Sequence, residues 1–172
     1  METRFMKWLR DWIETLAISA ILTTFILTYV GRSCIVVGSS MEPTLHTGER
    51  LMVERVSVHL NNFEKGDIVV FEQDWSDEAL IKRLIGMPGD CIEIRDTKLW
   101  VNGELLDEPY LSEPIYGDYG PVWVPEDTFF VLGDNRNNSN DSRGSVGFLA
   151  KDLMIGRAFV RFWPLTQLSF FF

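Results

Sequence analysis

Cysteine and histidine are scarce in this chain of 172 residues, which contains two of each. Two cysteines are too few for the disulfide framework of a small secreted domain, although a single bridge between Cys34 and Cys91 stays open. The same scarcity leaves too few ligands for a zinc site built from cysteine and histidine. We therefore expect no metal site and no cofactor.

Positive charge is also in short supply. The chain has 16 lysine and arginine residues against 25 acidic ones, which gives a formal net charge of −9. A strongly acidic chain repels phosphate backbones, so the composition argues against a nucleic-acid partner. The sequence has no internal repeat and no low-complexity tract, and its length suits one domain with a substantial core.

Only one long apolar run is present, and it covers residues 12–30. As a helix, these 19 residues extend about 28 Å, close to the thickness of a bilayer core. Trp8, Trp12 and Tyr29 fall where aromatic side chains gather at membrane interfaces. The run therefore predicts one N-terminal transmembrane helix.

The charges around this run predict its orientation. Three basic residues, Arg4, Lys7 and Arg10, precede the run, whereas only Arg32 closely follows it. By the positive-inside rule, the N-terminus lies in the cytoplasm and the rest of the chain lies on the far side of the membrane.

A cleaved secretory signal and a buried helix are the alternatives to a permanent anchor. Residues 31–34 lack the small-x-small pattern of a cleavage site. The run shows no polar face beyond scattered serine and threonine, unlike a helix packed on a soluble core. We therefore expect an uncleaved anchor over residues 1–33 and an extracytoplasmic domain over residues 34–172.

After residue 33 the hydrophobic pattern changes to short runs separated by turn residues, which is typical of strands. Strands are predicted at residues 50–56, 68–71, 80–85, 91–94, 99–101, 128–132 and 155–163. Residues 104–125 contain four prolines and predict an irregular excursion. The domain is therefore expected to be mainly β. Its apolar end, residues 165–172, suits either core burial or contact with a membrane surface.

Ser40 is the first candidate for chemistry. The β-branched run that precedes it consists of Ile35, Val36 and Val37. A serine at a strand end, with backbone N–H groups exposed beside it, meets the needs of a nucleophile next to an oxyanion site. Glycine, serine, proline and threonine are also ordinary in surface loops, so a loop without chemistry stays the alternative.

Lys82 is the second candidate, because it interrupts a strand that is otherwise apolar apart from Arg83. Burial disfavours an ammonium, lowers its pKa and makes a neutral amine available as a general base. The guanidinium of Arg83 does not give up its proton near neutral pH. The alternative is a lysine that protects an edge strand from aggregation.

The segment 133–144 is the third candidate, dense in turn formers and placed after a predicted strand. Its acidic positions do not fit a calcium loop. Asp141 and Arg143 are expected to pair and hold this loop rigid. Ser139 is expected to orient a neighbouring group by a hydrogen bond.

The two histidines do not complete a convincing catalytic triad with Ser40. Neither His46 nor His59 has an obvious orienting acid. A Ser/Lys pair, which is a known variant of the serine catalytic triad, suits the available residues better.

Four segments resemble the conserved boxes of bacterial type I signal peptidases: residues 40–45, 66–71, 82–90 and 133–143. The resemblance extends from the anchor to Trp163. It implies a membrane-bound Ser/Lys endopeptidase that removes signal peptides from exported preproteins, cutting after small residues at positions −1 and −3. It also implies a signal-peptidase-type antiparallel β catalytic core with a small inserted β region, here about residues 91–125. The single anchor and short insert look more like the compact Gram-positive or cyanobacterial forms.

The resemblance assigns roles to single residues. It makes Ser40 the nucleophile and Lys82 the general base, with Ser139 hydrogen-bonded to Lys82. It makes Asp141 and Arg143 a supporting ion pair. The substrate is expected to lie extended and to add a strand beside Ile35, Val36 and Val37.

Two positions depart from the family pattern. Some members carry a serine two residues before the nucleophile, whose hydroxyl helps to stabilise the oxyanion, but this chain has Gly38 there. The backbone N–H of Ser40 is then the one obvious oxyanion donor. Asn137 replaces the aspartate that usually follows the arginine of the last box, so charge pairing by that side chain is lost.

The implied partners are secretory preproteins, membrane lipid and the protein-export translocon. The implied location is the plasma membrane, with the thylakoid membrane as the alternative. Two other protein classes stay open. Self-cleaving SOS-response repressors use a Ser/Lys dyad on a related β fold, but they are soluble and carry a DNA-binding region. A non-enzymatic anchored β-domain would tolerate the loss of Ser40 and Lys82.

Overall fold

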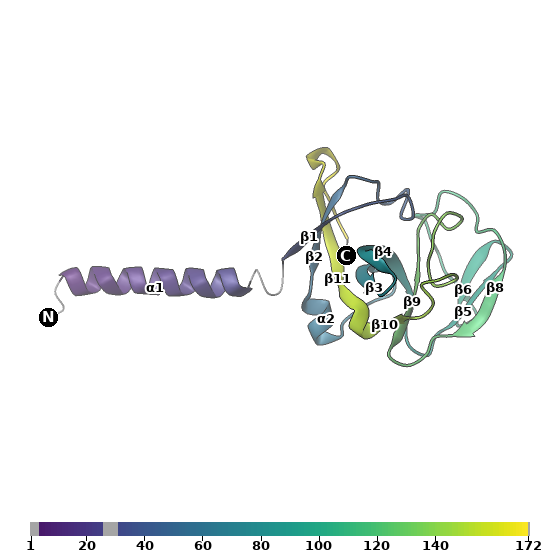
Figure 1. Ribbon diagram of the computed structural model, residues 1–172, viewed down its shortest axis with the longest axis horizontal. Coiled ribbons are helices and arrows are strands. Elements are labelled where there is room, and N and C mark those ends of the chain that lie inside the picture. Colours follow the sequence, from purple (N-terminus) through teal and green to yellow (C-terminus); the bar gives the residue numbers. More distant parts are fainter. Residues whose placement is uncertain (1–3, 26–30, 172) are drawn as a thin grey trace.

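The computed structural model describes residues 4–25 and 31–171 (Figure 1). Its first element is the helix α1 (Arg4–Phe25), none of whose residues is buried. The predicted transmembrane run continues beyond this helix, and residues 26–30 lie outside the described part of the chain. Among the described residues, no helix combines the length and the apolar character needed to cross a membrane.

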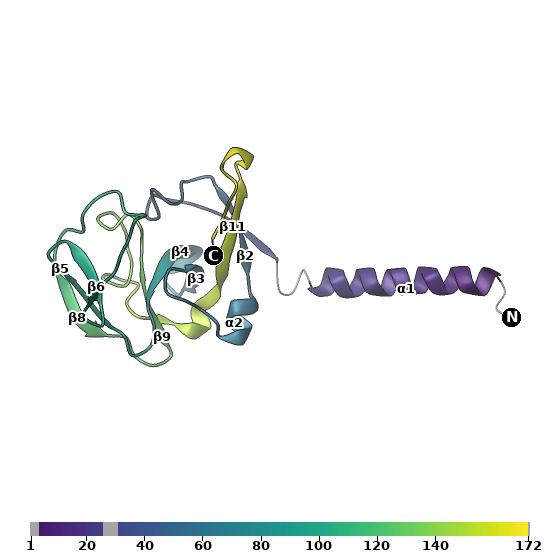
Figure 2. The same ribbon diagram turned by 180° about the vertical axis from the view of Figure 1, so that it is seen from behind.

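Residues 31–171 form a β-rich body with two antiparallel sheets (Figures 1 and 2). The larger sheet has the strand order β1-β2-β11-β3-β4-β9-β10, and β12 pairs with β11 beside this path. Its strands are β1 (Arg32–Ile35), β2 (Arg50–Glu54), β3 (Ile68–Gln73), β4 (Ser76–Gly86), β9 (Thr128–Leu132), β10 (Leu149–Ala150), β11 (Met154–Trp163) and β12 (Ser169–Phe170).

The smaller sheet has the strand order β7-β6-β5-β8. Its strands are β5 (Cys91–Arg95), β6 (Lys98–Val101), β7 (Glu104–Leu105) and β8 (Tyr119–Trp123). All four strands lie within the predicted insert, residues 91–125. Both views place β5, β6 and β8 at the end of the body farthest from β1 (Figures 1 and 2).

Every strand that the sequence predicts has a counterpart in the body. The predicted strand 50–56 ends at Glu54, because the short helix α2 (Val56–Leu60) begins two residues later. The carboxylate of Glu54 accepts the N–H of Ser57 in the first turn of this helix, at 3.0 Å. The excursion predicted over residues 104–125 is only partly irregular, since it contains β7 and β8, which pair with β6 and β5. The unpredicted strands have only two residues or are interrupted by polar residues, glycine or proline, so their sequences lack a continuous apolar run.

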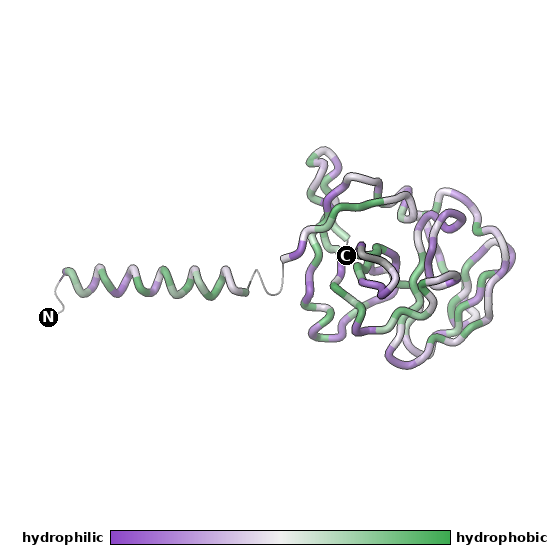
Figure 3. The backbone as a smooth tube through the Cα atoms, in the orientation of Figure 1, coloured by the Kyte–Doolittle hydropathy of each residue, from purple (hydrophilic) through white to green (hydrophobic). Residues whose placement is uncertain are grey.

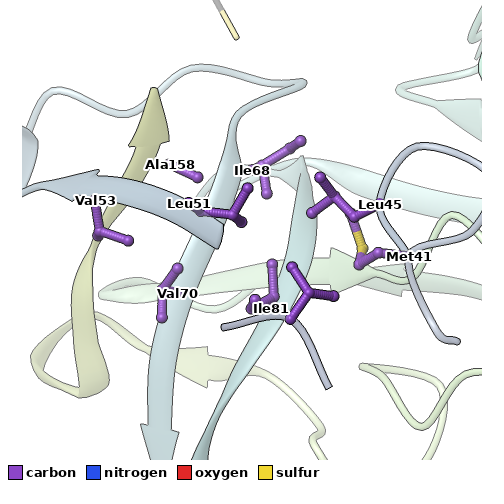
Figure 4. Close-up of a cluster of buried hydrophobic side chains, with 9 residues drawn as sticks. Met41, Leu45, Leu51, Val53, Ile68, Val70, Ile81 and Ala158 are labelled. Atoms are coloured by element: carbon purple, nitrogen blue, oxygen red, sulfur yellow. The ribbon is translucent and has the colours of Figure 1, made fainter. Parts of the chain in front are cut away.

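A buried apolar cluster fixes the chain on both sides of the candidate site. Met41 follows Ser40, Ile81 precedes Lys82, and both belong to this cluster together with Leu45. The strands β2, β3 and β11 supply Leu51, Val53, Ile68, Val70 and Ala158 (Figure 4). Burial of one such aliphatic side chain contributes on the order of 1.5–3 kcal/mol. Figure 3 shows apolar stretches along the strands of the body, in keeping with this core.

The apolar C-terminal segment divides between core and surface. The 3-10 helices η2 (Lys151–Leu153) and η3 (Leu165–Gln167) precede β11 and β12, and β12 returns to pair with β11. Phe171 packs against the buried cluster. The large side chains that stay exposed in this segment are Leu165, Leu168 and Phe170. Both cysteines are free thiols, with Cys34 in β1 and Cys91 in β5.

Candidate active site

Ser40 and Lys82 meet in the body although they are distant in sequence. Ser40 lies in a turn shortly after β1, and Lys82 lies in β4, where it pairs with Val69 of β3. Lys82 Nζ is 2.8 Å from Ser40 Oγ, and it donates a hydrogen bond to the carbonyl oxygen of Ile81 at 2.9 Å. A separation of 2.8 Å allows direct proton transfer between amine and hydroxyl.

The amine of Lys82 is removed from water, since only 3 % of this residue is exposed. Burial disfavours the charged form and lowers the pKa of Lys82 to about 8, while the carboxylates of Asp141 and Asp134 act in the opposite direction. A substantial fraction of the amine is therefore neutral in mildly alkaline solution, as a general base requires.

The loop of residues 133–144 holds the segment around Ser40 from one side. The N–H of Asn135 donates to the carbonyl oxygen of Ser40 at 3.0 Å, and its side-chain amide donates to the carbonyl oxygen of Ser39 at 3.1 Å. The side-chain amide of Asn138 donates to the hydroxyl of Ser39 at 3.1 Å. These contacts fix the peptide groups on both sides of the Ser40 Cα atom.

Asp141 and Arg143 form an ion pair within this loop, with 2.8 Å between Arg143 Nη2 and Asp141 Oδ2. The Asp141 carboxylate also accepts the N–H of Gly133 at 3.1 Å, and Arg143 donates to the carbonyl oxygen of Arg136. Asp141 is buried, so its charge is compensated by charge-assisted hydrogen bonds rather than by water. The pair therefore cross-links the two ends of the loop.

Ser139 lies in the same loop, but the hydrogen bond expected between it and Lys82 is not formed. The Ser139 hydroxyl oxygen is buried and has no hydrogen-bond partner within residues 4–25 and 31–171. It packs against Gly133 instead. A Cβ atom added to Gly133 would lie 2.2 Å from Ser139 Oγ and 2.5 Å from the carbonyl oxygen of Ser40. The Lys82 amine is directed to Ser40 and Ile81.

Asn137 connects the loop to the insert. Its side-chain nitrogen donates to Glu113 Oε1 and to the carbonyl oxygen of Pro114, both at 2.9 Å. Its side-chain oxygen accepts the N–H of Tyr116 at 2.9 Å. An aspartate at this position could not donate to two oxygen atoms, so the amide suits the contacts that this chain makes.

A second buried ion pair lies next to Lys82, and the sequence pattern did not reveal it. Arg83 binds the carboxylate of Asp134 through Nε at 2.8 Å and Nη2 at 2.6 Å, and its Nη1 donates to the carbonyl oxygen of Gly66 at 2.8 Å. Thr44 donates its hydroxyl to the same carboxylate at 2.5 Å. An arginine inside an apolar strand does signal a need for an acid partner, but the sequence does not say which acid.

A cleft of about 290 Å³ opens beside Ser40 and Lys82. One wall is the segment from β1 to the turn, namely Cys34, Ile35, Val36, Val37, Gly38 and Met41. The other wall is the first half of β4 with one residue of β3, namely Glu78, Ala79, Leu80, Ile81 and Val70. Neither histidine lines this cleft: His46 lies 3.5 Å from the carboxylate of Glu42, and His59 belongs to α2.

The wall that contains β1 has the properties of an edge strand. Val36 is buried, whereas Ile35 and Val37 are 56 % and 66 % exposed, so the side chains alternate. β1 ends the strand order of the larger sheet, so one of its edges has no neighbouring strand in the part of the chain that the structure describes. Gly38 has a φ of +88°, and a Cβ atom there would meet nothing within 4 Å. The cleft beside Ser40 is therefore open to an extended peptide.

Relatives of this chain share most of its length. A probable signal peptidase I-2 of Synechocystis is 43 % identical over 167 residues, which cover 92 % of this chain and 76 % of that protein. A signal peptidase I of Bacillus licheniformis is 38 % identical over 168 residues, which cover 92 % of this chain and 90 % of that protein.

A solved structure and a family model agree with these relatives. A signal peptidase I from Enterococcus faecalis, known from a crystal structure, is 34 % identical, and the match has a TM-score of 0.51. It covers 56 % of this chain and 96 % of that one. The model of the family described as signal peptidase, peptidase S26, matches residues 9–163. The chain therefore belongs to the signal peptidase family, peptidase S26.

Proposed function

We propose that this protein is a signal peptidase, a serine endopeptidase that removes N-terminal signal peptides from exported preproteins. The observation that carries the proposal is the 2.8 Å separation between the buried Lys82 amine and the Ser40 hydroxyl. Family membership supports the same activity, because the relatives are named signal peptidase I. It also favours this activity over a self-cleaving repressor and over a β-domain without enzymatic function.

The dyad accounts for peptide hydrolysis in two steps. Neutral Lys82 takes the proton of Ser40 Oγ, which attacks the carbonyl carbon at the signal-peptide boundary. The C–N bond then breaks, the Lys82 ammonium protonates the leaving amine, and the signal peptide stays attached to Ser40 as an ester. Lys82 next removes a proton from water, which attacks the ester carbonyl carbon. The bond between this carbon and Ser40 Oγ breaks, the Lys82 ammonium returns the proton to Ser40 Oγ, and the signal peptide leaves with a free carboxyl group.

The oxyanion of both steps requires hydrogen-bond donors beside Ser40. The backbone N–H of Ser40 supplies one donor. Gly38 brings no hydroxyl, so the family's second, side-chain donor has no equivalent at this position.

Ser139, Asp141 and Arg143 support the dyad in this proposal. After proton transfer, Lys82 is an ammonium with three N–H donors. Two of them have acceptors in Ser40 Oγ and the Ile81 carbonyl oxygen. The buried, unpaired hydroxyl of Ser139 is proposed as the third acceptor once the ammonium forms, while the Asp141–Arg143 pair keeps the loop in place.

The substrate is proposed to lie extended in the cleft and to add a strand beside Ile35, Val36 and Val37. Side chains at −1 and −3 of an extended peptide point to the same side. The buried residues Val36 and Ile81 form apolar walls of a cleft of only about 290 Å³. This geometry favours small side chains at both positions.

Replacement of a −1 alanine by phenylalanine in a preprotein is expected to lower kcat/KM by at least about 100-fold, because the larger ring has no room between these walls. The same replacement at −2, which points the other way, serves as the matched control and should be tolerated. Rates are read from release of the mature protein, and its new N-terminus is sequenced. Equal rates for the −1 and −2 substrates would contradict the proposed binding mode.

The pH dependence of cleavage reports the state of Lys82. The neutral amine is the active form, and the pKa of this group is lowered to about 8 by burial. We therefore expect kcat/KM to fall tenfold per pH unit well below pH 8, and to level off above it. A profile that stays flat down to pH 6 would exclude Lys82 as the base.

The domain organisation follows from the same proposal. Residues 12–30 anchor the chain in the plasma membrane, or in a thylakoid membrane, with the N-terminus in the cytoplasm and the catalytic domain, residues 34–172, on the other side. The exposed apolar side chains of α1 support a lipid environment. The site would then meet preproteins as they leave the export translocon. Retention of the full chain in membranes after alkaline carbonate extraction tests this arrangement.

A further inference from the structure

The insert places one aromatic side chain on Arg83, the residue that follows Lys82 in β4. The ring of Tyr110 covers the guanidinium of Arg83, whose central carbon lies 3.9 Å from the ring centroid. Arg83 is the next residue after Lys82 in β4. A cation over an aromatic face at this distance is attracted by the ring quadrupole, and more strongly where water is excluded.

A buried network holds Tyr110 in this position. Its hydroxyl donates to Glu108 Oε1 at 2.7 Å. The carboxylate of Glu108 accepts hydrogen bonds from both terminal nitrogens of Arg136, and Arg136 Nε donates to the carbonyl oxygen of Gly133 at 3.0 Å. The side chains of Arg136 and Glu108 are almost wholly buried, so this bidentate pair ties the insert firmly to the loop 133–144.

Arg83 links this network to Lys82. Its guanidinium is fixed from three directions, by the carboxylate of Asp134, the carbonyl oxygen of Gly66 and the ring of Tyr110. Asp134 is one of the two carboxylates that raise the pKa of Lys82. A cation held on Asp134 offsets part of the negative charge that this carboxylate presents to the Lys82 amine.

We propose that Tyr110 is a positioning residue for the general base: by stacking on Arg83 it holds this side chain on Asp134 and fixes the part of β4 that carries Lys82. The inference rests on the proposed function, because it assumes that Lys82 is the base. It gives the insert a part in catalysis, although the sheet of the insert lies at the far end of the body (Figure 1).

The direction of the effect follows from the charges near Lys82. The groups concerned are Asp134, Asp141, Arg83, Arg143 and Arg136. In the intact site each of the two carboxylates is paired with its own arginine. If Arg83 moves away from Asp134, the uncompensated carboxylate favours the ammonium and raises the pKa of Lys82. Fewer molecules then hold a neutral base at pH 7.

The test compares pH profiles of kcat/KM for preprotein cleavage by the full chain and its variants. In Tyr110→Leu the ring face is lost, and we expect the acid limb to move upward by about half a pH unit and kcat/KM at pH 7 to fall about threefold. Tyr110→Phe keeps the ring and should stay close to the wild-type profile. Tyr116→Leu alters a tyrosine of the same insert whose side chain is exposed, and its profile should be unchanged.

The outcomes separate positioning from general stabilisation. An acid limb at the wild-type pH in a folded Tyr110→Leu variant overturns the inference, and so does an equal shift in Tyr110→Phe or Tyr116→Leu. If Tyr110→Leu does not fold, Tyr110→Met, whose flexible side chain fills more of the space, is measured in its place with the same expected shift. A wild-type chain that cleaves no preprotein refutes the proposed function itself, which distinguishes the two failures.

Discussion

Replacement of Lys82 by alanine is expected to lower kcat for preprotein cleavage by at least about 10⁴-fold. The loss follows because Ser40 Oγ then has no base within hydrogen-bond distance, and removal of one member of a serine-protease catalytic unit typically costs this much. The measurement is a single-turnover cleavage assay, with circular dichroism to show that the variant is folded.

Two controls make this result specific. His46→Ala should keep nearly full activity, because His46 does not line the cleft and lies beside Glu42. The double variant of Ser40 and Lys82 should be no slower than either single alanine variant, since the two groups act as one unit. A folded Lys82→Ala variant with near wild-type kcat would show that another group is the base.

Replacement of Gly133 by alanine is expected to damage the site as well, although less severely than the loss of Lys82. The new Cβ atom would lie 2.2 Å from Ser139 Oγ and 2.5 Å from the backbone carbonyl oxygen of Ser40, so the turn that carries the nucleophile must move. Overpacking of this kind costs roughly 1–3 kcal/mol of stability. A displacement of about 1 Å at a nucleophile costs on the order of 100-fold in rate. We therefore expect both losses, measured by thermal unfolding and by kcat/KM.

Gly144→Ala is the matched control in the same loop. The nearest atom to a Cβ there is Asn140 Oδ1 at 3.0 Å, the end of a side chain rather than backbone. Its effect on stability should stay below about 0.5 kcal/mol, with activity close to wild type. If Gly133→Ala kept the wild-type kcat/KM, the close packing of the loop against Ser40 would have no catalytic importance.

Strands of the body were predictable where a short apolar run is bounded by turn residues. Residues 68–71 and 128–132 are examples, and both occur as the buried strands β3 and β9. Lys82 was predictable as an unusual residue for the same reason, since a single charge in an apolar run requires an explanation. Features of this kind can be predicted from a few consecutive residues, without knowledge of contacts to distant segments.

Contacts between distant segments were not predictable. The Arg83–Asp134 pair joins β4 to the loop after β9, and the Tyr110–Arg83 stack joins the insert to β4. No local pattern encodes which acid meets Arg83 or which ring covers it. The sequence also could not show that the Ser139 hydroxyl lacks a hydrogen-bond partner among the described residues, because its position depends on the close approach of Gly133.

The arrangement of charges around Lys82 is compatible with its proposed role as the base. Asp134 and Asp141 both favour the ammonium form of Lys82, yet each is held by an arginine that compensates its charge. Burial of Lys82 is the larger influence and lowers its pKa to about 8. The two ion pairs therefore hold the site in place, while burial keeps the pKa of Lys82 below its ordinary value.

The most direct test is incubation of the purified full chain in detergent with a labelled preprotein, followed by N-terminal sequencing of the product. The account predicts that the wild-type chain releases a mature protein whose new N-terminus directly follows a small −1 residue, and that Ser40→Ala releases none. Cleavage by folded Ser40→Ala at the wild-type rate would contradict the assignment of Ser40 as the nucleophile and, with it, the proposed mechanism.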